Sequence, residues 1–267
     1  MTSLTVSQLF THPIKSAQGI QLSCMELNAR GPLHDRDWML VDSSNKFLTQ
    51  RQHPRMCLLK TSLGENSLRI RAPGMPVYEL ALGVSQDQAA VNVEVWGDTV
   101  NAQDCGDDAA QYLSDFLKRD CRLVHMPKKT KRQVDPEYAH SSNTVGFADG
   151  FPILLVSRSS FDLLNKRLGY PISIERFRPN IVIAGATAHA EDQWRKIRIG
   201  EVLISLPKLC SRCVIPSIDP STGEKDPLII QTLAAYRRKG KDINFGVNAL
   251  HHGCGKISVG DNVEIIA

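Results

Sequence analysis

Two cysteines separated by two residues form the segment with the clearest chemical potential. Cys210 and Cys213 stand in Cys-Ser-Arg-Cys, a spacing that brings two soft sulfur atoms within reach of one centre. Arg212 lies between them, and a neighbouring cation favours the thiolate form. The pair could supply half of a zinc site, a redox-active dithiol, or one sulfur ligand of a soft metal held mainly by a cofactor. Two structural thiols in a loop are the remaining alternative.

Each alternative makes a demand on the rest of the chain. A zinc site has no second Cys-X-X-Cys pair to draw on and would need His251, His252 and Cys254 as distant partners. A thioredoxin-like pair should open a helix, whereas the Val-Ile-Pro after Cys213 does not continue as one. The chain holds seven cysteines, and its N-terminus does not resemble a secretory signal. An odd number of cysteines then indicates free thiols in a reducing compartment, which predicts a cytoplasmic protein.

Cationic and hydroxyl side chains stand near the ends of several expected strands. Lys15 and Ser16 follow the first strand, Arg36 comes later, and Arg178 and Asn180 precede a buried strand. Lysine supplies a point charge, arginine a bidentate fork and serine a hydroxyl donor, and together these groups suit a phosphate. The arginines could equally form surface ion pairs, which are common and contribute little to stability.

A basic run, Lys128, Lys129, Lys131 and Arg132, lies within residues 126–143, a polar stretch without periodicity. The stretch is either a mobile linker or a loop over a site. Its charge indicates a solvated loop or a nearby anionic ligand such as a phosphorylated cofactor. The net charge of the whole chain is only +4, which is too small to indicate a nucleic-acid partner. The apolar runs are of strand length and fall short of the roughly 20 residues that a membrane span needs.

The elements that must position these residues are mostly short strands. Alternating or buried-strand patterns between turn residues predict strands at 4–10, 34–42, 67–71, 92–96, 153–156, 181–184, 196–199, 202–206, 256–259 and 262–266. Helical spacing of apolar residues predicts helices at 107–117, capped by Asp107 and Asp108, and at 159–168. We therefore expect a mainly β (α+β) fold with few helices, divided into a smaller β domain, residues 1–122, and a second β-barrel-like domain, residues 123–267.

Eight motifs connect the whole chain, in order, with a known family. They are His12-Pro-Ile-Lys-Ser, Asp35-Arg, Thr49-Gln-Arg, Phe147-Ala-Asp-Gly-Phe-Pro, Phe177-Arg-Pro-Asn, Cys210-Ser-Arg-Cys, Asp219-Pro-Ser-Thr-Gly and Val259-Gly-Asp. Together they resemble the MOSC proteins, and within them the bacterial YcbX type and the mitochondrial amidoxime-reducing components. The resemblance implies an N-terminal MOSC-associated β-barrel domain followed by a MOSC β-barrel domain with a few flanking helices.

The resemblance also implies a site. Its cofactor would be the molybdenum cofactor, in which the metal is held by the dithiolene of a molybdopterin and by one protein thiolate. Cys213, the second cysteine of the motif, would be that metal ligand and the catalytic residue, with Cys210 packed behind the site and Asp219 forming a turn. The implied cofactor-binding residues are Lys15, Ser16, Arg36, Asp149, Gly150, Phe151, Arg178, Asn180, Ser211, Arg212 and Asn248.

The activity that the resemblance implies is the reduction of small N-hydroxylated compounds, such as hydroxylaminopurines and amidoximes. Some YcbX-type chains continue into a ferredoxin-like domain, which this sequence lacks, and no dinucleotide fingerprint or group of four cysteines is present. We therefore expect electrons from a separate flavoprotein reductase or ferredoxin-like donor. Two alternatives remain: a molybdopterin carrier or sulfur-transfer protein without reductase turnover, and a zinc-stabilised binding module that uses Cys210, Cys213, His251 and Cys254.

Overall fold

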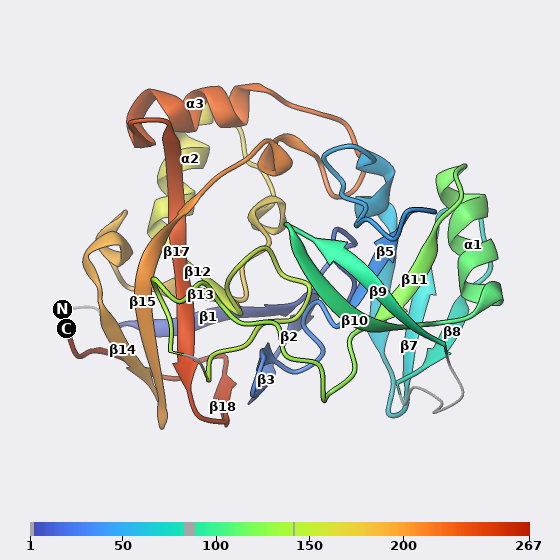
Figure 1. Cartoon of the computed structure of the whole chain (residues 1–267). Helices are drawn as coiled ribbons and strands as arrows, with labels where there is room; N and C mark the ends of the chain where they lie inside the picture. The colour runs from blue at the N-terminus through green and yellow to red at the C-terminus, as the bar shows by residue number, and fades with distance from the viewer. Residues whose placement is uncertain (1–2, 83–88, 141) are drawn as a thin grey trace.

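The chain folds mainly into β-strands, as the alternating patterns predicted. The computed structural model describes residues 3–82, 89–140 and 142–267, and in these residues three α-helices accompany the strands. Figure 1 shows two groups of strands, with helix α1 (Asp107–Leu117) on one flank and helices α2 (Arg158–Leu168) and α3 (Leu228–Arg237) at the opposite end. The two ends of the described chain lie close together, beside the larger group of strands (Figure 1).

A nine-stranded sheet forms the larger group within the described ranges. In spatial order its path is β19 (Val263–Ile265), β14 (Lys196–Ile199), β15 (Val202–Ser211), β17 (Asp242–His252), β12 (Ile153–Ser157), β13 (Ile181–Ala184), β1 (Thr5–Thr11) and β2 (Ile20–Leu22), with β16 (Arg238–Lys239) paired to β17. The amide of Val6 donates to the Asp261 carbonyl at 2.9 Å, and the amide of Val263 donates to the Leu4 carbonyl at 2.9 Å. These bonds join the strand at one end of the path to β1, so the sheet curls back on itself.

Alternation along the strands fills the interior of this sheet. In β15, Val202, Ile204 and Leu206 are buried while the residues between them are less so, as the period of two in a strand requires. The same core receives Val6 and Leu9 from β1. The outer face is covered by α2 and α3, whose apolar side chains pack with Phe177 and Phe245 in a second core; they are Phe161, Leu164, Ile229 and Leu233.

The N-terminal part builds two further sheets and packs α1 against them. The four-stranded sheet has the order β5 (Trp38–Val41), β11 (Arg122–His125), β10 (Asp98–Asp104) and β9 (Ala90–Val95), and the three-stranded sheet has the order β6 (Lys60–Leu63), β7 (Ser67–Arg71) and β8 (Tyr78–Ala81). Leu113 and Phe116 of α1 lie in the core that these sheets enclose. A small sheet of β18 (Gly255–Ser258), β3 (Cys24–Asn28) and β4 (Gly31–Pro32) joins the two ends of the chain.

Several predicted elements differ in detail from the structure. The strand expected at 34–42 begins only at Trp38, because His34 and Arg36 have left-handed backbone angles, φ 62° and 51°. The N-cap of α1 is Gly106, so the two aspartates lie inside the first turn instead of capping it. The last two predicted strands are both present but belong to different sheets: β18 pairs with β3, whereas β19 pairs with β14. A domain boundary at residue 122 stays a prediction.

The largest element that we did not predict from the sequence is β17. Its residues 242–249 alternate between polar or glycine positions and apolar ones, so the pattern of a strand is present. Gly246 has φ 77°, and a Cβ built on it would lie 2.8 Å from the Leu155 carbonyl oxygen. Glycine therefore lets β17 approach β12 closely at this point, as a glycine inside a strand often does.

Candidate active site

All the residues that the sequence assigned to a site line a cavity of about 800 Å³, its open mouth included. The wall is formed by residues of the N-terminal part and of the nine-stranded sheet, including the end of β15 and the middle of β17. The predicted members are Lys15, Ser16, Arg36, Asp149, Gly150, Phe151, Arg178, Asn180, Ser211, Arg212, Cys213 and Asn248. The remaining lining residues are Thr49, Arg51, Ala148, Leu154, Phe177, Cys210 and Ile215.

Unusual backbone geometry presents three of these side chains. Ser16, Arg36 and Arg178 have φ angles of 69°, 51° and 54°, in the left-handed region that residues other than glycine rarely adopt. Backbone hydrogen bonds hold the turns, among them Arg36 N–H to the His12 carbonyl at 2.9 Å and Arg178 N–H to the Glu175 carbonyl at 3.0 Å. Non-glycine residues in this region concentrate at functional sites, where the surrounding fold compensates the strain.

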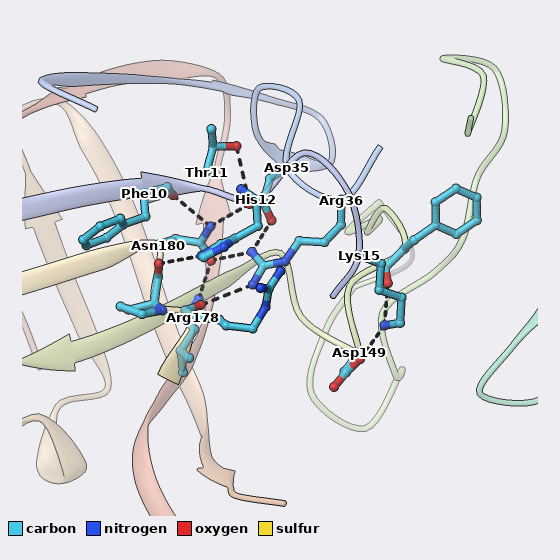
Figure 2. A network of polar contacts seen from close by, with 12 residues as sticks. Phe10, Thr11, His12, Lys15, Asp35, Arg36, Asp149, Arg178 and Asn180 are labelled. Atoms are coloured by element: carbon cyan, nitrogen blue, oxygen red, sulfur yellow. Dashed lines mark hydrogen bonds and ion pairs between the residues drawn. The ribbon is translucent and has the colours of Figure 1, made fainter. Parts of the chain in front are cut away.

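A buried carboxylate and a buried amide fix the direction of Arg36. Asp35 accepts hydrogen bonds from the His12 backbone N–H at 2.8 Å and from Asn180 Nδ2 at 3.0 Å, and it pairs with the Arg36 guanidinium (Figure 2). Asn180 Oδ1 in turn accepts from the Leu154 N–H at 3.1 Å and from Arg36 Nη1 at 3.2 Å. Asn180 thus uses its amide within the protein and acts on the cavity by positioning Arg36. In the sequence Asp35 was recognised only as part of a motif, and its role in positioning Arg36 was not predicted.

Arg178 brings an incompletely paired charge into the cavity. One of its terminal nitrogens, Nη1, donates to the Ala17 carbonyl, while Nη2 is buried without a hydrogen-bond partner in the described part of the chain. Burial, and after it the nearby Arg36 guanidinium, lowers the pKa of Arg178 to about 9. A cation whose charged form is disfavoured in this way is one that a bound anion would stabilise.

Lys15 and Asp149 form an ion pair that runs from the interior to the cavity mouth. Lys15 Nζ donates to the Phe147 carbonyl at 2.8 Å and pairs with Asp149, and the exposed fractions of the two side chains are 6% and 62% (Figure 2). Burial lowers the pKa of Lys15, and the Asp149 carboxylate opposes that shift. Desolvation acts against ionisation of Asp149, but the Lys15 ammonium outweighs it and holds the pKa of Asp149 well below its ordinary value.

The loop that carries Asp149 is held by a residue of the basic run. Arg132 is buried, and its Nη1 donates to the carbonyls of Gly146 at 3.1 Å and Ala148 at 2.6 Å, while its Nε pairs with Asp98 at 2.7 Å. The three lysines of the run are exposed. Treating all four residues as one solvated or ligand-facing surface was therefore wrong for Arg132, because backbone carbonyls of the 146–149 loop turn it inward.

Both thiols of the Cys-X-X-Cys segment line the cavity. Cys213 is half-buried, and so is Cys210, which the family resemblance had implied to lie behind the site. The Arg212 guanidinium lies on Cys210, with Nη1 3.0 Å from Sγ, and its Nη2 donates to the Phe177 carbonyl at 2.9 Å. Its Nε is buried without a partner among the described residues. The cation of the motif therefore contacts the first cysteine.

The proposed partners of a zinc site lie elsewhere. His251 bonds to the Gly253 carbonyl at 2.8 Å, and His252 bonds to the Ser205 hydroxyl at 2.7 Å. In residues 3–82, 89–140 and 142–267, no three His, Cys, Asp or Glu side chains come together in a way that could hold a metal ion. The zinc alternative thus lacks a ligand set in this part of the chain.

The two arginines of residues 176–180 have different roles: one forms an ion pair, and the other is available to an anionic ligand. Arg176 is buried and pairs with the half-buried Asp219, 2.5 Å from Nη2 to Oδ2, whereas Arg178 faces the cavity. Asp219 also accepts the Ser221 N–H at 2.7 Å, so the expected turn-forming role of this aspartate is confirmed.

The fold and the cavity together define a mainly β protein with a cation-rich, thiol-bearing pocket. Comparison with known proteins identifies its family. Residues 3–120 match the MOSC N-terminal beta barrel domain, and residues 142–264 match the MOSC domain. The chain belongs to the MOSC family that includes the mitochondrial amidoxime-reducing components, as the eight motifs predicted.

The relatives are matched over most of their length. Mitochondrial amidoxime-reducing component 1 of Mus musculus is 34% identical over 98% of this chain and 82% of its own. Component 2 of Bos taurus is 35% identical over 87% of this chain and 72% of its own. Component 1 of Homo sapiens is 33% identical over 98% of this chain and 83% of its own. None of the helices in the described residues has the length and apolar character to cross a membrane.

Proposed function

We propose that this protein reduces small N-hydroxylated compounds, such as amidoximes and hydroxylaminopurines, with a molybdenum cofactor bound in the cavity. The observation that carries the proposal is that two incompletely paired arginines, Arg178 and Arg212, meet accessible thiols in one pocket. The relatives are named for amidoxime reduction, which supports the substrate class. The cavity supports the cofactor, since a molybdopterin presents an anionic phosphate and a soft metal centre.

The residues present fit such a group. The buried Nη2 of Arg178 and Nε of Arg212 are unpaired donors within the described ranges, and Lys15 and Arg36 are fixed beside them by hydrogen bonds to the protein. Charge-assisted hydrogen bonds to phosphate are among the stronger polar contacts that a protein makes. Cys213 would ligate the metal, with Ser211 and Arg212 beside it in the chain. Asp149, Gly150 and Phe151 would close one wall, and Asn248 another.

When bound, the cofactor would supply the two-electron chemistry that removes oxygen from an N–OH group. The balanced reaction converts R–C(NH2)=N–OH, two electrons and two protons into R–C(NH2)=NH and water. Lys15 holds a proton at Nζ inside the cavity, and Asp149 connects it with the solvent. Asp35 and Asn180 keep Arg36 pointed at the cavity, so that binding does not require these groups to reorganise.

Electrons would come from a separate flavoprotein reductase or ferredoxin-like protein. A cytoplasmic location remains our expectation from the cysteine content, although the relatives carry the word mitochondrial in their names. Neither nucleic acid nor a membrane enters the proposed activity.

The test is turnover. Protein made in a host that synthesises the molybdenum cofactor should convert benzamidoxime into benzamidine when reduced methyl viologen supplies electrons. A molybdopterin carrier or sulfur-transfer protein would bind the cofactor and yet leave benzamidoxime unchanged. That result, with the cofactor shown to be present, would overturn the reductase proposal.

A further inference from the structure

Trp96 has a conformation that a tryptophan rarely adopts. It occupies the turn between β9 and β10 with φ 55°, and Gly97 follows with φ 89°. Turns with two successive positive φ angles favour Asn-Gly or Asp-Gly, and a bulky residue there is strained. The side chain is 44% exposed, and Trp96 is the only aromatic residue among the exposed large apolar side chains of the described part of the chain. Solubility and turn geometry both argue against tryptophan here.

Trp96 contacts two residues of the candidate active site. Its indole Nε1 donates to Asp149 Oδ1 at 3.0 Å. The Arg51 guanidinium lies 4.4 Å from the indole centroid, and the Phe47 ring lies 5.0 Å away. Asp149 and Arg51 both line the cavity. Figure 1 shows the turn between β9 and β10 pointing toward the middle of the molecule, where the two groups of strands meet.

A second hollow opens beside the cavity, and Trp96 forms part of its wall. It measures about 1410 Å³, its open mouth included, and is bounded by residues 96–100, 131–136, 149–151 and Lys208. Residues 149–151 also line the cavity, so the two spaces share one wall. Phe151, a member of the shared wall, packs edge-on against Tyr138 with 6.0 Å between the ring centroids.

We propose that this hollow is the substrate subsite and that the Trp96 indole is the face on which a planar substrate stacks. The inference rests on the proposed function, because the reacting N–OH group must reach the cavity behind residues 149–151. An aromatic side chain binds a planar ring system by stacking on its face, and this contact tolerates different ring structures. Trp96 is thus a specificity-determining residue. Its strained turn places the indole against Asp149 of the shared wall.

The polar groups at the shared wall narrow the substrate class. The Asp149 side chain is 62% exposed, and its Oδ1 pairs with Lys15 and accepts the indole N–H, which leaves Oδ2 for a ligand. A carboxylate beside an aromatic face suits a planar compound that carries N–H donors, which describes an aryl amidoxime or a hydroxylaminopurine. Arg51 lies against the same indole, so its charge adds a cation–π contact that stiffens the platform.

Two measurements on the cofactor-loaded enzyme test this assignment. In the first, kcat/KM is compared for planar benzamidoxime and for small acetamidoxime. We expect Trp96→Leu to lower the ratio of the two values about tenfold, which corresponds to about 1.4 kcal/mol of lost stacking. Trp96→Phe, which keeps a ring, should restore much of the ratio, and Trp194→Phe should leave it unchanged. A role confined to packing would lower both kcat/KM values equally, and an unchanged ratio in Trp96→Leu would overturn the proposal.

The second measurement requires no turnover. Trp38 and Trp194 are 1% and 5% exposed, so a ligand in the hollow should act mainly on Trp96 emission. Benzamidine should therefore quench the tryptophan fluorescence of the wild type and of Trp194→Phe, and Trp96→Phe should lose that response. An equal response in Trp96→Phe would place the ligand elsewhere. If the wild type reduces neither amidoxime, the proposed function fails, and the fluorescence titration still decides whether the hollow binds a planar amidine.

Discussion

At the scale of single residues, charge dominates the cavity. Among the described residues, its lining contains five cationic side chains and one carboxylate, Lys15, Arg36, Arg51, Arg178 and Arg212 against Asp149. Cations that face one another in a partly buried space repel, and the repulsion is weakly screened there. An anion that enters relieves this repulsion in addition to accepting hydrogen bonds. The preference for an anionic ligand is therefore a property of the whole group of side chains.

Arg178 gives a direct prediction about binding. Arg178→Ala removes a donor with an unpaired Nη2, so cofactor affinity should fall about tenfold or more, since each charge-assisted contact contributes roughly 1.5–3 kcal/mol. The melting temperature of the cofactor-free protein should change little, because the arginine is itself poorly compensated. Molybdenum and pterin content after dialysis measures the effect, with the exposed Arg167→Ala as the control. Full retention by Arg178→Ala would remove this arginine from the site.

The two thiols should differ in importance. Serine is a harder donor than a thiolate, so Cys213→Ser should abolish benzamidoxime reduction. Cys210→Ser should retain measurable activity, because its sulfur contacts Arg212 and needs no metal. Viologen-driven rates of the two purified variants decide the matter. Equal loss in both would indicate that the cysteines act as a unit, which would favour a dithiol mechanism.

The motifs and their order identified most residues that line the cavity. They did not predict orientations that are set by contacts with distant parts of the chain. Arg51 is part of the Thr49-Gln-Arg motif, yet its direction is set by stacking on Trp96, which lies on another element. The left-handed backbone of Trp96 has no signature in the local sequence, since Asn or Asp would be expected there. Such placements follow from tertiary contacts, which a pattern along the chain does not contain.

At the scale of elements, the 146–149 loop determines where Asp149 lies, and Arg132 holds that loop. Arg132→Met should lower the free energy of unfolding by about 2–4 kcal/mol, because it leaves buried carbonyls without donors. The neighbouring Lys131→Met removes an exposed charge and should cost less than about 0.5 kcal/mol. Urea unfolding of the two variants makes the comparison. If they lose equal stability, the inward contacts of Arg132 are not what fixes the loop.

Regular patterns led to the prediction of some elements, although the alternating β17 was overlooked. Strand β14 alternates cleanly and is followed by a glycine turn, and the predicted starts of β14 and β15 at Lys196 and Val202 are confirmed. Helix α3 was missed because its Leu-Ile-Ile run is rich in β-branched residues, and its helical form depends on packing Ile229 and Leu233 against Phe245. In that segment tertiary packing outweighs the low helix propensity of the β-branched residues.

At the scale of the whole molecule, the absence of a dinucleotide fingerprint predicts how electrons enter. The purified protein should be inert with NADPH and benzamidoxime, and reduced viologen should support turnover. Adding a flavoprotein reductase from the same cell should restore dependence on NADPH. The exposed Lys128, Lys129 and Lys131 offer a charged surface, so the coupled rate should fall steeply with salt while the viologen rate changes little. Turnover of NADPH by the isolated chain would contradict this electron path.

The central claim is that the cation-rich cavity holds a molybdenum cofactor. It is tested most directly by elemental and pterin analysis of the wild-type protein, purified from a molybdenum-replete host alongside a known molybdenum enzyme from the same cells. We predict molybdenum and pterin in equal amounts, close to that of the protein, with no stoichiometric zinc. A protein that carries zinc in place of molybdenum, or neither metal while the control enzyme is loaded, would contradict the account.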